Sequence, residues 1–142
     1  MTKNFKYQIL GKFIKDLSSE TQDVETYLFV RDNIQTYHLG IDITSKAIKN
    51  KLIEINTTLK FEDKNENKKK AYFEIIYATI IKVDDDVKDK KQLEKIILCD
   101  AQIAIYPDLE KTILDLLHNS GYPGVKFDKK IDFEDLYKKR FS

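Results

Sequence analysis

Apolar and polar side chains alternate along most of the N-terminal half of the chain, and a period of two is typical of β-strands. The alternation predicts a first strand over residues 4–20, in which the odd-numbered positions are mostly apolar. It predicts further strands at 36–44, 52–62 and 71–83. We expect Gly11, in the middle of the first strand, to mark a bulge or a bend.

The connections between the later strands are short and polar. Residues 45–51 and 63–70 are rich in Lys and Asn, which is typical of hairpin turns. Such short connections cannot make the crossovers that parallel strands need. We therefore predict a four-stranded antiparallel sheet with the simplest order, a meander.

The strand at 71–83 is apolar on both of its faces. Its odd positions from Phe73 to Val83 form one apolar set, and the even set holds Tyr72, Ile76, Ala78 and Ile80 with only Glu74 and Lys82 between them. A central strand covered by helices on one side and by another subunit on the other is the common explanation. A second interpretation adds an apolar groove for unfolded polypeptides.

The hydrophobic period changes to that of a helix after the fourth strand. Residues 90–104 fit a helix, although 102–106 fit an extended segment equally well. Pro107 suits the first position of a clearer helix with an apolar stripe, and Gly121 suits its end. Asp132 is a good N-cap for a short last helix.

Four strands followed by helices predict an α+β fold with the helices gathered on one side of the sheet. The length of 142 residues and the lack of a Pro-, Gly- or Ser-rich linker predict one domain over residues 1–142.

The formal net charge is +1, so no overall field points to nucleic acid or to a membrane surface. The single cysteine, Cys99, excludes an internal disulfide and fits a reducing cytoplasm. We find no membrane-spanning apolar run and no secretory signal.

Few residues carry a pattern typical of catalysis. The three aspartates at 84–86 lack the spacing of a calcium loop and read as a solvated turn. The position of Cys99 in an apolar segment indicates a role in packing. His118 lies near the end of a helix, where it complements the helix dipole. The four glycines do not form a phosphate-binding loop, so we expect no nucleotide, no metal and no other cofactor.

Three stretches occur in an order and spacing that resemble one known family. They are an aromatic, Lys-Asp and acidic stretch at 13–20, the fourth strand at 73–83, and a helix, a Gly-x-Pro turn and a terminal "DF-x-x-LY" helix within 105–137. Together they resemble the bacterial protein-export chaperone SecB. The resemblance implies a homotetramer, built as a dimer of dimers in which sheets sandwich the long helices. It implies ATP-independent binding of unfolded preproteins in the cytoplasm and delivery to the SecA motor. Where that family usually has Tyr-Ala-Arg after the proline, this chain has Asp108, Leu109 and Glu110.

The resemblance also implies functional residues. Asp16, Glu20 and Glu74 match the acidic residues with which the family docks SecA, and their even numbers predict that they share the face opposite the core. For preprotein binding we expect two sets: Leu39, Ile41 and Ile43 by resemblance, and Tyr72, Ile76 and Ile80 from the two-faced strand.

Two alternatives remain open on the sequence. A small-molecule-binding or hydrolytic α+β domain would need several polar groups that converge in a pocket. A SecB-like chaperone dedicated to one partner, such as an antitoxin, would keep the fold and change the client. The sequence does not separate this second alternative from general export.

Overall fold

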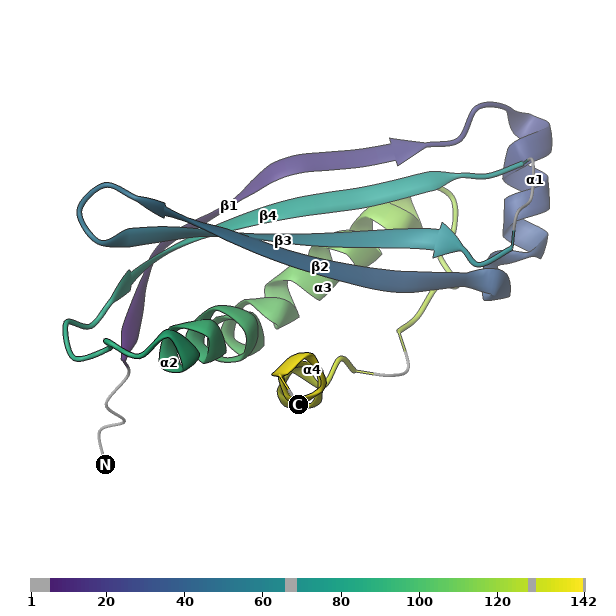
Figure 1. The fold of residues 1–142 in the computed structure, drawn as a ribbon. Helices are drawn as coiled ribbons and strands as arrows, with labels where there is room; N and C mark the ends of the chain where they lie inside the picture. The colour runs from purple at the N-terminus through teal and green to yellow at the C-terminus, as the bar shows by residue number, and fades with distance from the viewer. Residues whose placement is uncertain (1–5, 66–68, 128–129, 142) are drawn as a thin grey trace.

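The computed structural model describes residues 6–65, 69–127 and 130–141, and the C-terminal helices lie on one face of its antiparallel sheet (Figure 1). The strands are β1 (Tyr7–Glu20), β2 (Tyr37–Ile48), β3 (Leu52–Asp63) and β4 (Tyr72–Val83). The helices are α1 (Val24–Asp32), α2 (Lys90–Lys95), α3 (Ala101–Asn119) and α4 (Phe133–Phe141). A 3₁₀ turn, Ile34–Thr36, precedes β2, and a π-helical turn, Ile96–Asp100, joins α2 to α3. The predicted α+β class is confirmed. Residues 4 and 5 of the predicted first strand and 66–68 of a predicted turn lie outside the described residues.

The strand order is β1-β4-β3-β2, so the predicted meander is wrong for β1. Hairpins join β2 to β3 and β3 to β4, but β1 pairs antiparallel with β4 and not with β2. The segment that contains α1 carries the chain past the end of the sheet to the opposite edge (Figure 1). The predicted turn at 45–51 is also shorter than expected, because β2 continues to Ile48.

The core lies between the sheet and α3. The odd-numbered side chains of β4 from Phe73 to Ile81 are buried, as the alternation predicted. They face the apolar stripe of the long helix, which consists of Ile105, Leu109, Ile113 and Leu117, all fully buried. We call this side of the sheet the helix face and the other side the open face. Burial of aliphatic and aromatic side chains on one face is what orients the sheet against the helices.

β1 contains two irregularities that change which face its residues occupy. The register against β4 shifts by one residue between Ile9 and Gly11 and again between Ile14 and Asp16. The first shift confirms the bulge expected at Gly11. Between the two shifts Phe13 lies opposite Ala78, an even position of β4, so Phe13 is on the open face and is 48% exposed. The strict alternation of faces on which the placement of the acidic residues was based therefore fails between the two shifts.

Helix α1 had no counterpart among the predicted elements. Asp23 caps it, because its carboxylate accepts a hydrogen bond from the Thr26 amide at 2.8 Å. Tyr27 ties the helix to the end of α3: its hydroxyl donates to the Gly121 carbonyl at 2.8 Å, and its ring lies 5.4 Å from that of Tyr122. The sequence signal was present in the N-cap and in the spacing of Tyr27, Val30 and Ile34.

The predicted helix boundary at Pro107 is wrong. Helical backbone runs from Lys90 through the π turn to Asn119, and Pro107 lies inside α3. Proline removes the hydrogen bond to the carbonyl four residues earlier, that of Ile103. Both Ile103 and Pro107 are exposed, so water can satisfy this carbonyl. The helical alternative for 90–104 is the correct one.

One buried polar pair joins this long helix to the sheet. The Thr57 hydroxyl on β3 donates to the Gln102 side-chain carbonyl at 2.9 Å, and the Gln102 amide donates to the Ile97 carbonyl in the π turn at 3.2 Å. Both side chains are fully buried. The two hydrogen bonds provide partners for the buried Thr57 hydroxyl and for both the oxygen and the nitrogen of the Gln102 side chain.

The predicted end of the long helix at Gly121 and the predicted N-cap of the last helix, Asp132, are confirmed. α3 ends in a Schellman arrangement, in which the Tyr122 amide donates to the Leu117 carbonyl at 3.0 Å and Gly121 has a φ of 105°. At the start of α4, the Asp132 carboxylate accepts a hydrogen bond from the Asp135 amide at 3.0 Å. α4 then docks through Phe133, whose ring meets that of Tyr106 at 5.3 Å.

Candidate functional site

An apolar cleft lies on the helix face at the edge of the sheet. It has a volume of about 170 Å³ and is lined by Ile41, Asp42 and Ile43 of β2, Leu98 of the π turn, and Leu136 and Tyr137 of α4. Leu39, Ile41 and Ile43 are partly buried and pack against the core. Because β2 is an edge strand, one side of its backbone has no partner strand in this sheet. The cleft therefore combines apolar side chains with an unpaired strand edge.

The other predicted apolar set lies on the opposite side of the sheet. Tyr72, Ile76 and Ile80 are even positions of β4 and face the open side. Tyr72 is 38% exposed, whereas Ile76 and Ile80 are half-buried between neighbouring strands. The structure therefore does not bring the two predicted preprotein-binding sets together.

The three predicted acidic residues share the open face. By register Asp16 lies opposite Ile76, Glu20 opposite Tyr72, and Ser18 opposite Glu74. Asp16 accepts a hydrogen bond from the Ser18 hydroxyl at 2.7 Å, and Glu74 pairs with Lys60 at 3.4 Å.

Two further carboxylates complete an acidic end of this face. Glu62 and Asp42 are even positions of β3 and β2 on the same side, and with Glu74 they line a depression of about 430 Å³. Sequence reasoning missed them, although their even numbers in predicted strands were a usable signal. We call Asp16, Glu20, Asp42, Glu62 and Glu74 the acidic end.

Tyr72 reports on the electrostatics of the acidic end. Burial raises the pKa of Tyr72 to about 12, with help from a hydrogen bond to Glu74 and from the charges of Glu74, Glu62 and Asp16. The unfolded chain has the ordinary tyrosine pKa of 10.0. Folded protein thus keeps this proton while unfolded protein releases it, and the contribution to stability is lost as pH rises from 10 toward 12.

We expect the free energy of unfolding of Tyr72→Phe to fall less steeply with pH above 10 than that of the wild type. Urea unfolding between pH 9 and 11.5 measures the two slopes. Glu74→Gln removes one of the causes of the raised pKa of Tyr72. The pH dependence of its free energy of unfolding should therefore lie between those of Tyr72→Phe and the wild type. Equal slopes in all three proteins would contradict this account of the acidic end.

The remaining sequence candidates have structural roles. Asp85 and Asp86 lie in an exposed turn and pair with Lys51 at 3.0 Å and Lys6 at 3.1 Å. Cys99 is buried, and burial raises the pKa of its thiol, which disfavours the reactive thiolate. His118 contacts the Val125 carbonyl through Nε2 at 3.0 Å. Within residues 6–65, 69–127 and 130–141, no three His, Cys, Asp or Glu residues are placed to hold a metal ion.

Large apolar side chains are also exposed along β1, the other edge of the sheet. The exposed fractions of Leu10, Phe13, Ile14 and Leu17 lie between 44% and 49%, and Ile103 on α3 is 51% exposed. Monomeric proteins rarely leave such side chains together on an edge strand, because an apolar edge associates with other chains. In the described part of the chain no helix is both long and apolar enough to cross a membrane.

An antiparallel sheet with helices on one face, an apolar cleft and a charged open face defines a protein-binding module of the α+β class. The chain matches the family described as preprotein translocase subunit SecB over residues 1–142. It therefore belongs to the SecB family of protein-export chaperones, which is not a family of enzymes.

Relatives agree with this assignment. A protein of Pelagibacter ubique strain HTCC1062, named as a protein-export protein SecB, is 62% identical over 140 residues and 99% of either chain. The protein-export protein SecB of Jannaschia sp. strain CCS1 is 28% identical, over 96% of this chain and 81% of its own.

A solved structure shares the fold. It is a SecB-like chaperone of Mycobacterium tuberculosis in complex with a peptide from an antitoxin, with a TM-score of 0.63 and 15% identity, over 88% of this chain and 91% of that one.

Proposed function

We propose that the chain is an ATP-independent holdase that binds unfolded preproteins in the bacterial cytoplasm and delivers them to SecA for export. The observation that carries this proposal is the apolar cleft left uncovered beside β2. The export name shared by the relatives supports it. Non-directional apolar burial suits clients that share no sequence.

The apolar cleft is the proposed preprotein site. An unfolded chain offers apolar side chains and free backbone groups. The former would be buried against Ile41, Ile43 and Leu136 at about 25 cal/mol per Å². The latter would pair with the unpaired edge of β2, so that Leu39 also lies along the path of the client. On the open face, Tyr72, Ile76 and Ile80 are proposed as a second, shallower contact.

The acidic end of the open face is the proposed SecA site. Asp16, Glu20 and Glu74 project from a rigid sheet, which fixes their spacing before a partner arrives. A basic segment of SecA would complement them and would associate faster at low salt. The client cleft lies on the other face, so a client held in the cleft leaves the acidic end free for SecA, whereas the second client contact on the open face overlaps the acidic end.

We propose a homotetramer, arranged as a dimer of dimers, in which β1 and α3 are the contact elements. Support comes from the apolar edge of β1 and from Ile103, which assembly would bury. Several weak client sites in one particle raise avidity through effective concentration. Each contact then stays reversible, and release needs no fuel.

We expect the wild-type protein to retard refolding of a denatured secretory precursor without ATP, and Ile41→Thr with Leu136→Ser to weaken this holding about tenfold, because two apolar cleft surfaces are lost. The rate of refolding as a function of chaperone concentration measures the effect. Val24→Ser with Leu28→Ser, a similar change on exposed residues of α1, is the matched control. A monomer by light scattering that leaves refolding unchanged would overturn the proposal.

SecA docking is tested separately. Asp16→Lys with Glu20→Lys should weaken binding of SecA but spare client holding, whereas Asp85→Lys with Asp86→Lys, the same charge change in the turn after β4, should spare both. Surface plasmon resonance at two salt concentrations provides the measurement. Unchanged SecA binding in the first variant would refute the docking assignment. Absent SecA binding by the wild type, with tight binding of one cytoplasmic protein, would instead favour a dedicated chaperone.

A further inference from the structure

The charges of the open face are separated along the direction of the strands. The acidic end lies toward the start of β4, where five carboxylates accompany one lysine, Lys60. Toward the end of β4, the open-face lysines are Lys15, Lys46 and Lys82, and they accompany one carboxylate, Glu54. We call these three lysines and Glu54 the lysine end. Counting only the open-face residues of the four strands, formal charges give about −4 at one end (five carboxylates and one lysine) and +2 at the other (three lysines and one carboxylate).

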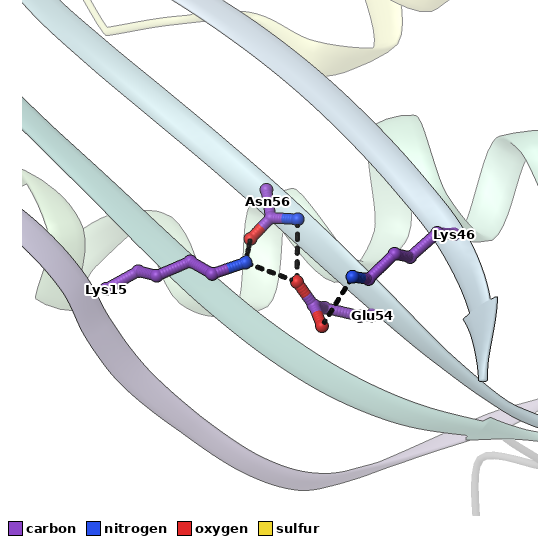
Figure 2. Close-up of polar contacts among 4 residues, drawn as sticks. All are labelled: Lys15, Lys46, Glu54 and Asn56. Carbon is purple, nitrogen blue, oxygen red and sulfur yellow. Dashed lines mark hydrogen bonds and ion pairs between the residues drawn. The ribbon is translucent and has the colours of Figure 1, made fainter. Parts of the chain in front are cut away.

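The lysine end is held in a fixed arrangement. Lys15 pairs with Glu54 at 2.6 Å and donates to the Asn56 side-chain oxygen at 3.3 Å (Figure 2). Asn56 in turn donates to Glu54 at 2.9 Å, and Lys46 approaches the other carboxylate oxygen at 3.8 Å (Figure 2). The Glu54 side chain is only 16% exposed. The carboxylate is thereby used within the protein, and the lysines present the excess positive charge.

Lys15 reaches this position because of the second irregularity in β1. It is the extra residue between Ile14 and Asp16, and its partners are on β3, so its side chain crosses over β4. It does so at Ala78, whose small side chain leaves room on the open face and is fully buried. Hydrogen bonds from Lys15, the larger effect, and from Asn56 lower the pKa of Glu54, so this carboxyl group stays ionised at neutral pH.

From this separation we infer that the open face binds a polypeptide segment of dipolar charge: basic residues over the acidic end and carboxylates over the lysine end. The inference rests on the proposed SecA site and extends it, because it specifies an acidic element in the docking partner as well as a basic one. Glu74 and Ile80 are six residues apart on β4, so the two charged parts of the segment lie about 20 Å apart.

The lysine end gives the docking a direction. A dipolar segment that arrives reversed would place like charges against both ends, and like-charge contacts disfavour wrong orientations. A uniformly basic segment would gain at the acidic end and lose at the lysine end. Ile76, which lies between the two ends, contacts either orientation equally. Charge order therefore sets orientation, and apolar contact adds affinity.

Synthetic peptides test the inference on the full-length protein. One peptide carries a lysine cluster, an uncharged spacer that spans about 20 Å, and a glutamate cluster. A second has the same composition with alternating charges, and a third replaces the glutamates with glutamines. We expect the first to bind about tenfold more tightly than the second and more tightly than the third, by fluorescence anisotropy at low salt.

Lys46→Glu with Lys82→Glu should weaken binding of the first peptide about tenfold and leave binding of the third unweakened. Both changes leave Lys15 and Glu54 themselves unaltered, Lys46→Glu removes the 3.8 Å ion pair with Glu54, and circular dichroism checks the fold. Lys88→Glu with Lys95→Glu, the same charge change on exposed residues outside the sheet, is the control. Equal binding of the first and second peptides, or no effect of the lysine changes, would overturn the inference.

Two further outcomes distinguish a failure of this inference from a failure of the proposed SecA site. If Asp16→Lys with Glu20→Lys abolishes SecA binding while Lys46→Glu with Lys82→Glu changes neither peptide nor SecA binding, only the inference fails. If the first peptide binds as expected but SecA does not bind, only the proposed function fails. A smaller particle after the lysine changes, by sedimentation, would show that a second copy covers this face and would also overturn the inference.

Discussion

Gly121→Ala is expected to lower the free energy of unfolding by about 3 kcal/mol, one of the two largest effects we foresee. A φ of 105° is rarely adopted by residues with a Cβ atom. An added Cβ would also lie 2.5 Å from Cε1 of Tyr27, and 3.2 Å from its Cζ. The ring must move, and the hydrogen bond from its hydroxyl to the Gly121 carbonyl is then lost.

The measurement for Gly121→Ala is urea unfolding, together with hydrogen exchange of the α1 amides. Exchange in α1 should quicken more than exchange in the sheet, because Tyr27 is the anchor of that helix. Gly124→Ala is the matched control, since a Cβ there meets no atom within 4 Å. If the two alanine variants unfold alike, the close packing of Tyr27 on Gly121 does not contribute to stability as described.

Gln102→Ala should cost a comparable amount, about 3 to 4 kcal/mol, for a different reason. It opens a cavity beneath β3 and leaves the Thr57 hydroxyl buried without its hydrogen-bond partner. Gln102→Met conserves volume and isolates the polar part of the loss. Thr57→Val alone should also destabilise, because the Gln102 carbonyl oxygen then lacks its donor.

A double-mutant cycle by chemical denaturation tests this interpretation. Thr57→Val combined with Gln102→Met should be markedly less destabilising than the sum of the single changes, because both polar partners are removed together. Additive losses would mean that the hydrogen bond across the helix and the sheet is not what couples these residues.

Side-chain alternation alone was enough to predict β3, a central strand with one face buried. β4, the other central strand, was recognised as an apolar run in which only two charged residues, Glu74 and Lys82, interrupt the even positions. The cap residues Gly121 and Asp132 were equally informative, because their conformational roles are local. The order of the strands was not predictable in this way. β1 and β4 are far apart in the sequence, and β1 covers the edge that β4 would otherwise expose. Local side-chain patterns do not indicate this pairing.

The acidic residues were placed on the correct face through an argument that was incomplete. The alternation of odd- and even-numbered positions assigned Asp16 and Glu20 to the open face. This assignment holds only because β1 has two one-residue shifts that cancel. Between the shifts the same argument fails for Phe13. The contact of Lys15 with Glu54 depends on the second shift in β1. Side-chain alternation therefore could not predict the lysine end. Pro107 was misplaced because a local preference for the first helical position was outweighed by continuous packing of α3.

The paired irregularities of β1 make the number of residues in this strand as important as their identity. Removing Gly11 alone would invert the side chains on one flank of the deletion, and either the acidic residues or Tyr7 and Ile9 would then point the wrong way. A deletion at one irregularity that is matched by a deletion at the other keeps the side chains at both ends of β1 on their original faces. Homologues that differ in the length of this strand should therefore differ by an even number of residues, or should carry a second irregularity that restores the pairing.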